Sequence, residues 1–191
     1  MREHHPYGTF IPKGCRAMII GSFPIGKFSH PGRKNEIKPH EIDFFFGGEK
    51  NLLWRLMGDT FEKKLKTKDA IVELLREKKL GIGDVIRSCK RHNGGGSDKD
   101  LLEIEWNTDL LSEIHKHKIK RVYFTGKGVE KWFRKLFPES ALEMVNLISP
   151  SAQSARALGR NPDFIAWRRK NPTLPVYDFV LISYKKVFHR S

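Results

Sequence analysis

The residues that could do chemistry in this chain gather in two short stretches. Residues 44–46 are consecutive phenylalanines, a Gly-Gly pair follows, and Asn51 then precedes an apolar, helix-like segment. Aromatic rings stack on flat π-systems, and a carboxamide both donates and accepts hydrogen bonds. Upstream, an apolar run at 18–20 leads into a loop rich in glycine and proline at 21–26. Together the two stretches predict a pocket that holds a planar group between aromatic side chains.

The charge of the chain indicates what kind of molecule carries that planar group. Its 191 residues include 36 Lys and Arg against 22 Asp and Glu, a formal net charge of +14 at pH 7. Such a surplus favours a polyanionic partner, because each phosphate contact releases condensed counterions. We therefore expect nucleic acid as the partner. The alternative is a basic protein whose charge serves only its solubility.

Other features of the composition argue against several classes of protein. No stretch approaches the roughly 18 apolar residues of a membrane-spanning helix, and residues 1–6 lack the apolar core of a signal peptide. Cys15 and Cys89 are far apart and fit a reducing cytosol, so we expect a cytoplasmic protein, associated with the nucleoid in a prokaryote. The spacing of His, Cys and carboxylate residues matches no metal site, and we expect neither metal nor cofactor. His4 and His5 are expected to lie on a loose N-terminus.

Hydrophobic periodicity and turn residues divide the chain into alternating elements. Strands or apolar strand-like segments are expected at 16–22, 84–89, 121–126, 142–148 and 176–188. Helices are expected at 49–57, 69–79, 110–116, 128–136 and 163–170. Gly58 is expected to end the first helix, and residues 27–42 form a basic, loop-like insertion. The alternation predicts one α/β domain over 1–191, a three-layer α/β/α sandwich around a central, mainly parallel sheet of about four strands.

In such a sheet the ligand site lies beyond the carboxyl ends of the strands. This rule places three loops in one neighbourhood, namely those that follow Ile20, Phe124 and Ile148. Two of them contain the glycine-proline and serine-proline turns of the chain. The third begins with Thr125.

Five segments, taken in order, resemble the uracil-DNA glycosylase superfamily, and most closely its hypoxanthine-DNA glycosylase-like and mismatch-specific-like branch. The segments are 21–26, 45–55, 83–91 with 97–98, 120–127 and 148–152. The resemblance covers about residues 15–156. It implies a monomeric DNA repair glycosylase that flips a deaminated base, uracil or hypoxanthine, out of damaged or mispaired duplex DNA and hydrolyses its N-glycosidic bond.

The resemblance also gives roles to individual residues. Asn51 matches an important asparagine of this branch and would orient the attacking water or read the base, although an Asn after Gly-Gly is also a good helix cap. Ser22 stands where many members carry a catalytic Asn or Asp. Phe23 and Phe46 would stack on the flipped base. Backbone N–H groups from Gly21 onward would bind a base carbonyl as negative charge grows on it. The neighbouring Phe44 and Phe45 are expected in the core.

The remaining predicted contacts are to DNA. Ser149 and Ser151 would clamp the DNA backbone, unless this segment is a simple strand-to-helix loop, and Gln153 and Arg156 would fill the gap left by the flipped base. The cations expected at phosphates, if their loops share the ligand edge, are Arg87, Lys90, Arg91 and Lys127.

The sequence departs from the family pattern at three places. Ser22 replaces the usual Asn or Asp, Thr125 stands where an Asn is common, and Gln153 with Ser154 takes the place of a His. These departures keep open a second hypothesis, a catalytically weak or inactive nucleic-acid-binding protein on the same fold. A phosphate-loop or dinucleotide enzyme is disfavoured, because neither Gly-x-x-x-x-Gly-Lys-Ser/Thr nor Gly-x-Gly-x-x-Gly occurs. No lysine is placed for a Schiff base, so strand cleavage is not expected.

Overall fold

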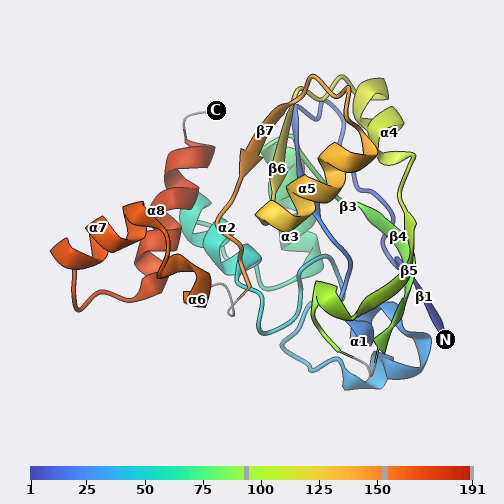
Figure 1. Cartoon of the computed structure of the whole chain (residues 1–191), viewed down its shortest axis with the longest axis horizontal. Helices are drawn as coiled ribbons and strands as arrows, with labels where there is room; N and C mark the ends of the chain where they lie inside the picture. The colour runs from blue at the N-terminus through green and yellow to red at the C-terminus, as the bar shows by residue number, and fades with distance from the viewer. Residues whose placement is uncertain (93–94, 152–154, 190–191) are drawn as a thin grey trace.

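The centre of the molecule is a parallel sheet of four strands (Figure 1). The strands are β2 (Ala17–Gly21), β3 (Leu80–Asp84), β6 (Arg121–Phe124) and β7 (Glu143–Asn146). They lie in the order β3-β2-β6-β7 and all run in the same direction. The computed structural model that shows them describes residues 1–92, 95–151 and 155–189. The predicted central parallel sheet is confirmed.

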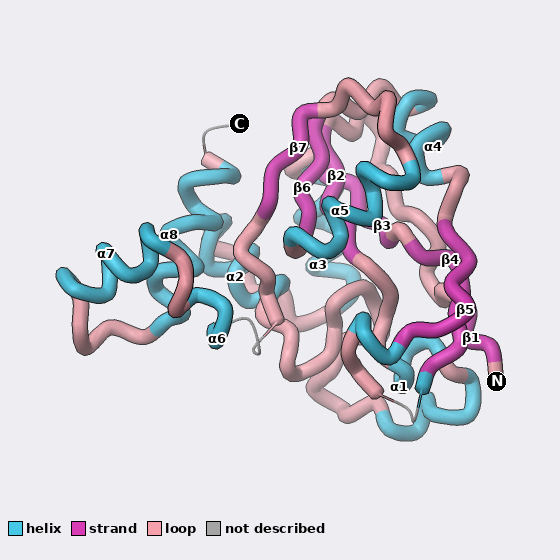
Figure 2. Tube along the Cα trace, viewed as in Figure 1, coloured by secondary structure: helices cyan, strands magenta, loops and turns pink. Residues whose placement is uncertain are grey.

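Helices cover both faces of this sheet, because successive side chains of a strand point to opposite sides. The helices concerned are α2 (Leu53–Phe61), α3 (Lys68–Glu77), α4 (Leu110–Lys116), α5 (Lys127–Leu136) and α8 (Val176–Phe188). Ile19 and Tyr123 pack in one core with α2, α3 and α8, whereas Ile20 and Phe124 pack in another with α4 and α5. Figure 2 shows the resulting layers of helix and strand. The three-layer α/β/α sandwich is therefore confirmed.

A second sheet, antiparallel and three-stranded, is not anticipated by the sequence patterns. Its strands are β1 (Arg2–His4), β4 (Ile86–Arg91) and β5 (Leu101–Trp106), in the order β1-β4-β5. Only Val85 separates β4 from β3, so the chain passes directly from one sheet into the other. The expectation of a loose N-terminus is wrong, because β1 pairs with β4 and the His5 N–H donates to the Arg87 carbonyl at 2.9 Å.

The segment 176–188 is a helix, α8, and not extended as expected. Its many β-branched and aromatic residues favour a strand by composition. The residues that the fold buries are Val180, Tyr184 and Phe188, spaced four apart as on one face of a helix. Tyr184 also donates from its hydroxyl to the Ile148 carbonyl at 3.0 Å. Packing against the sheet thus outweighs local propensity here.

The helix α2 differs from its predicted bounds at both ends. It begins at Leu53 and not at Glu49, and it continues past Gly58 to Phe61. Gly58 is needed inside the helix because the chain folds back over it: a Cβ there would approach the Lys63 carbonyl oxygen to 2.7 Å. The helix ends instead at Glu62, whose backbone is left-handed at φ 56°.

The insertion 27–42 is better ordered than a loop. It contains α1 (Gly26–Ser29) and the 3-10 helix η1 (Pro31–Glu36). Its last turn is held by the buried carboxylate of Glu41, which accepts hydrogen bonds from the Lys27 ammonium at 2.5 Å and from the backbone N–H groups of Lys38 and Glu49 at 2.9 Å. Glu41 therefore ties the insertion to the Gly-Gly segment that precedes α2.

The remaining helices are η3 (Asp98–Asp100), α6 (Ala155–Leu158) and α7 (Pro162–Lys170). In Figure 1, α6 and α7 extend with α8 to one side of the sheet (left). Within the described part of the chain, none of the helices combines the length and the apolar character that crossing a membrane requires.

Glu41 gives a prediction for the pH dependence of stability. Burial opposes its ionisation, but hydrogen bonds from Lys27 and from two backbone N–H groups outweigh this and lower its pKa from 4.5 to about 2. A depressed carboxyl pKa contributes stability that is present above about pH 4.5 and is lost as the pH falls toward 2. We expect roughly 3 kcal/mol of unfolding free energy to disappear over this window.

Urea unfolding at pH 5, 4, 3 and about 2 measures this effect. The Glu41→Gln variant should be less stable at pH 5 and should lack this share of the pH dependence. Glu73→Gln, at an exposed position of α3, is the matched control and should follow the wild type. Equal slopes in all three proteins would contradict the assignment to Glu41.

Candidate active site at the carboxyl edge of the parallel sheet

The loops that follow the parallel strands meet at one edge of the sheet, as predicted. The Thr125 N–H donates to the Ile20 carbonyl at 3.1 Å, so the loop after β6 lies beside the end of β2. The Leu52 N–H donates to the Pro150 carbonyl at 2.8 Å, and Asn51 forms an antiparallel bridge with Ser151. The start of α2 and the loop after β7 are thereby joined. Hydrogen bonds of the backbone, and not side chains alone, build this site.

The most distinctive group at this edge is the carboxylate of Asp84, at the end of β3. Its residue is only 4 % exposed. Oδ2 is 2.9 Å from Nε2 of His5, whereas Oδ1 is buried without a hydrogen-bond partner among the described residues. A buried unpaired oxygen is costly in a stable fold, and a bound water or ligand that completes its hydrogen bonding removes this cost.

Gly21 lies opposite Asp84 in the strand register, and its lack of a side chain lets the Asp84 carboxylate and the Phe46 ring pack closely against the backbone. A Cβ on Gly21 would collide with both Asp84 Oδ1 and the ring edge of Phe46. Phe46 itself is half-buried and has a left-handed backbone, φ 55°. The next residue, Gly47, has no room for a Cβ because the Ile42 carbonyl lies against it. The aromatic run therefore turns so that Phe46 faces the carboxylate of Asp84.

His5 holds the other oxygen of Asp84 in place. Its Nδ1 accepts a hydrogen bond from the Tyr7 N–H at 3.3 Å, which places the ring proton on Nε2 and makes Nε2 the donor to Asp84. The His5 side chain is 7 % exposed and contacts the rings of Phe45, at 5.1 Å between centroids, and Phe23, at 5.9 Å. Burial raises the pKa of Tyr7, and its hydrogen bond to Asp43 adds to this rise. Tyr7 is therefore a neutral donor beside the site.

Asp84 and His5 are functional candidates that the sequence patterns do not single out. Asp84 lies within the segment 83–91 that carries the family resemblance, and its place directly after an apolar strand is the signal that could have found it. His5 could not be found in this way, because only the β1–β4 pairing, between residues far apart in sequence, brings it to the sheet edge.

The predicted base-binding aromatics occupy different environments. Phe23 is 9 % exposed and packs in the core on the α5 face of the sheet, with the Arg91 guanidinium 5.9 Å from its ring centre. Phe46 is the more accessible ring and stands next to Asp84. Phe44 and Phe45 are 4 % and 1 % exposed, which confirms that they belong to the core. Stacking by Phe23 and Phe46 stays a prediction.

Asn51 lies one residue before the N-cap position of α2, which is occupied by Leu52, so the predicted cap position is off by one residue. The Asn51 Oδ1 accepts a hydrogen bond from the Leu53 N–H at 2.9 Å, at the start of α2. This bond and the bridge to Ser151 fix where the carboxamide lies at the sheet edge. A role in orienting water or a base stays a prediction.

Ser22 donates from its hydroxyl to Oδ1 of Asp98 at 2.8 Å. Desolvation and the negative charge of Asp84 raise the pKa of Asp98, while the Ser22 hydrogen bond and Arg91 oppose the rise. Because much of Asp98 is open to solvent, we base no proton-transfer role on this shift. The contact shows that the first loop is tied to residues 97–98, a part of the predicted segment with no assigned role.

Among the predicted DNA contacts, Arg91 is placed differently from the prediction. Its side chain is 3 % exposed and donates to the Glu3 carboxylate at 3.2 Å, the Gly95 carbonyl at 2.9 Å and the Pro24 carbonyl at 2.7 Å. A guanidinium used in this way holds the first loop against β4. We therefore leave Arg91 out of the proposed phosphate contacts.

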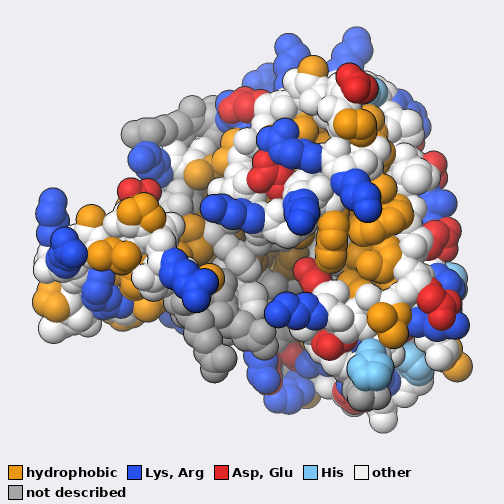
Figure 3. Space-filling view, in the orientation of Figure 1, with side chains coloured by type: hydrophobic (Ala, Val, Ile, Leu, Met, Phe, Trp, Pro, Cys, Tyr) orange, Lys and Arg blue, Asp and Glu red, His pale blue; other side chains and the backbone are white. Residues whose placement is uncertain are grey.

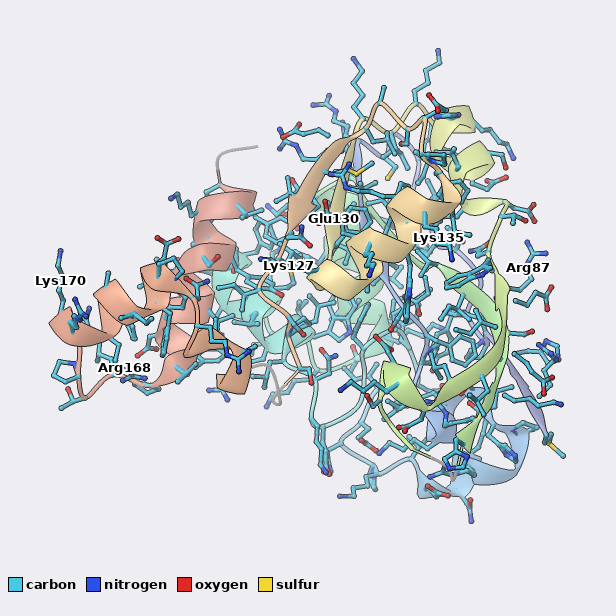
Figure 4. All side chains as sticks on the ribbon, viewed as in Figure 1. Arg87, Lys127, Glu130, Lys135, Arg168 and Lys170 are labelled. Atoms are coloured by element: carbon cyan, nitrogen blue, oxygen red, sulfur yellow. The ribbon has the colours of Figure 1, made fainter. Side chains whose placement is uncertain are left out.

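The structure describes five of the other predicted DNA contacts, namely Arg87, Lys90, Lys127, Ser149 and Ser151. Arg87 pairs with Asp109 at 2.5 Å and Lys90 with Glu103 at 2.7 Å. Lys127 is exposed at the start of α5, well separated from Arg87 on β4 (Figure 4). Ser149 and Ser151 are half-buried beside Asn51. Gln153 and the side chain of Arg156 lie outside the described residues.

A metal site receives no support from the geometry. Across residues 1–92, 95–151 and 155–189, no three His, Cys, Asp or Glu side chains come together as metal ligands would. The chemistry available at the edge is that of a buried carboxylate, a histidine, hydroxyls, a carboxamide and backbone N–H groups.

Comparison with known proteins finds a solved structure of similar fold. The fold superposes on a solution NMR structure from Methanosarcina acetivorans, of a protein whose name, uracil DNA glycosylase, is itself provisional. The TM-score is 0.60, the sequence identity is 16 %, and the match covers 97 % of this chain and 98 % of that one. The two chains share a fold. No protein-family model matches the sequence, and no curated protein matches it either.

The close packing of Asp84 and Phe46 around Gly21 can be tested by substitution. Gly21→Ala should lower the unfolding free energy by about 1–3 kcal/mol, because the added methyl would collide with the Asp84 carboxylate and the Phe46 ring and force these side chains to shift. Gly128→Ala, in α5, is the matched control: its Cβ would meet nothing within 4 Å, and alanine is the better helix former. The melting temperatures of the two variants should therefore shift in opposite directions. Equal shifts would contradict the steric role of Gly21.

Proposed function

We propose that this protein is a DNA glycosylase that hydrolyses the N-glycosidic bond of a deaminated base flipped into the pocket at the carboxyl edge of the sheet. The observation that carries the proposal is the buried, unpaired Oδ1 of Asp84 beside Gly21 and Phe46. The shared fold with a protein named as a uracil DNA glycosylase supports it. So does the large positive charge of the chain.

A carboxylate at the floor of the pocket suits deaminated bases. In its ionised form it only accepts hydrogen bonds, so it pairs with a ring N–H. Uracil and hypoxanthine carry such an N–H at the ring position where cytosine and adenine carry a bare nitrogen. Asp84 would thus accept from the lesion and leave the bare ring nitrogen of the normal base unpaired, which is how a polar pocket discriminates.

Phe46 would provide the stacking surface for the flipped base. Extruding a base costs a few kcal/mol, least for a mispaired or damaged one, and stacking on an aromatic ring returns about 1–3 kcal/mol. Negative charge that grows on the departing base would be met by the backbone N–H groups of the loop that begins at Gly21. Asn51, fixed by its bridge to Ser151, would position the attacking water.

Contacts with the DNA backbone would come from the two loops that meet at this edge. Ser149 and Ser151 would hold phosphates on the side of Asn51, and Lys127 would add charge beside them. Gln153 and Arg156 stay proposed for the gap left by the flipped base. The substrate in this proposal is double-stranded DNA with a damaged or mispaired base, bound by a monomer.

A second candidate function is a nucleic-acid-binding protein with weak or no catalysis. The observation that favours it is that Oδ1 of Asn51 accepts a hydrogen bond from the Leu53 N–H and the Ser22 hydroxyl donates one to Asp98. Neither group is then fully available to a water molecule or a base.

Base release from labelled oligonucleotides tests the proposal. Substrates contain uracil, hypoxanthine, xanthine or no lesion, and abasic sites are revealed with alkali. We expect release of at least one deaminated base, reduced at least about tenfold in Asp84→Asn, or about 1.4 kcal/mol of transition-state stabilisation. The new carboxamide can still accept from His5 through its oxygen, so the variant should melt no lower than the wild type while losing activity. Asp69→Asn, on the exposed side of α3, is the control of equal charge change.

Asn51→Ala separates the two candidate functions. A glycosylase that uses this carboxamide should lose base release at least about tenfold, while loss of the hydrogen bond to the Leu53 N–H should lower the melting temperature only slightly. No release from any substrate by the wild type, together with tight and salt-sensitive DNA binding, would contradict the enzyme and leave the binding protein.

A further inference from the structure

A second feature of the molecule lies at the opposite edge of the parallel sheet, where its strands begin. A cavity of about 710 Å³ opens there between the starts of the strands and the ends of α2, α3 and α8. Its cationic lining consists of Arg16, Lys78, Lys79, Lys118, Lys120 and Arg121. Figure 3 shows lysine and arginine side chains projecting from this end of the molecule (top). The proposed glycosylase pocket does not use this groove.

The positive charge of the groove is only partly neutralised by its own carboxylates. Glu77 pairs with Lys78 at 3.0 Å and Glu143 with Arg121 at 2.7 Å. Within the described part of the chain, no ion pair involves the four other cations, all of them exposed: Arg16, Lys79, Lys118 and Lys120. Four unpaired positive charges around one groove favour a polyanion.

Three of these cations form a row. The Arg16 N–H donates to the Lys79 carbonyl at 2.9 Å, and the Lys120 N–H donates to the Arg16 carbonyl at 3.3 Å. They are the residues immediately before β3, β2 and β6, so neighbours stand about 4.8 Å apart, the spacing of strands in a sheet. A row of charges along a sheet edge matches a linear polyanion better than a single compact ion.

The backbone conformation at two of these lysines also supports a polyanion site. Lys79 and Lys118 have left-handed backbones, φ 52° and 56°, directly after the C-caps of α3 and α4. Glycine is the preferred residue at this position of a helix end. The chain carries a lysine at both.

Phe61 provides the accessible aromatic ring of the groove. It is half-buried under the Lys78 ammonium, 4.8 Å away, whereas Tyr123 and Phe188, with ring centroids 4.8 Å apart, are 1 % and 7 % exposed and form the buried floor. Cations beside aromatic rings are the combination that single-stranded nucleic acid binds.

We propose that this groove is a second nucleic-acid-binding site, which takes the phosphodiester backbone of a single strand along the row Lys79, Arg16 and Lys120, with Lys118 beside it. It is separate from the base pocket, and it needs no base release. The protein would therefore hold nucleic acid at both edges of its sheet.

The test measures binding of a fluorescent, lesion-free single-stranded oligonucleotide by the full chain over about 50–200 mM KCl, the range in which counterion release is resolved. The variant Lys79→Gln/Lys118→Gln/Lys120→Gln should bind more weakly, and its slope of log K against log salt should be flatter by about 2, or about 0.7 for each phosphate that is no longer neutralised. Lys64→Gln/Lys66→Gln/Lys170→Gln removes the same charge from exposed lysines elsewhere and should keep the wild-type slope.

Three results would overturn the proposal. Equal slopes for the two triple variants would show that only the total charge matters. A lower melting temperature of the groove variant with unchanged binding would show that the lysines merely compensate the carbonyl ends of α3 and α4. Displacement of the strand from the groove by millimolar nucleoside triphosphate, but not by duplex DNA, would show a small polyphosphate as the ligand instead. Base release is read separately, so failure here leaves the proposed glycosylase activity standing or falling by its own assay.

Discussion

The hydrogen bond between His5 and Asp84 is the interaction on which the proposed active site depends. It joins a residue just beyond β1 to the end of β3 and holds one carboxylate oxygen while the other faces Gly21 and Phe46. The pairing of β1 with β4 makes this possible, and Glu3, buried on β1, is itself held by Arg91 and by the Ser29 hydroxyl. The antiparallel sheet is thus the support that aims a carboxylate into the edge of the parallel one.

The buried acids Glu3, Glu41 and Asp84 each have a partner from another part of the chain. Glu3 and Glu41 pair with the cations Arg91 and Lys27, whereas Asp84 accepts a hydrogen bond from His5. Pairing of this kind is required, because an isolated buried charge is far too costly to keep. Of the three, only Asp84 has an oxygen left without a partner among the described residues. The internal acids position loops, and the charges of Glu3 and Glu41 are balanced within the fold.

The sequence patterns predicted three of the four parallel strands and most helices, because buried strands such as β2 and β6 are short apolar runs between turn residues. They missed β3, whose Gly81 and Gly83 interrupt the apolar pattern, and the predicted strand 84–89 belongs to the antiparallel sheet as β4. They failed for α8. Its β-branched and aromatic residues favour a strand by composition, but the buried residues Val180, Tyr184 and Phe188 are spaced four apart, as on one face of a helix. They also failed for His5, since no local pattern shows a contact across 79 residues of sequence. Asn51 was found by its type and position. Its hydrogen bond to the start of α2 shows why residue type alone cannot separate a structural from a chemical role.

The central claim is that a deaminated base enters the pocket and donates its ring N–H to Oδ1 of Asp84. The most direct measurement is a crystal structure of the protein bound to duplex DNA that carries the released base on a 2′-fluoro sugar, since the fluorine slows hydrolysis by destabilising the sugar cation. The account predicts the base out of the helix, against Phe46, with its ring N–H within about 3.2 Å of Asp84 Oδ1. A base bound elsewhere, or one still stacked in the duplex with Oδ1 of Asp84 unapproached, would contradict it.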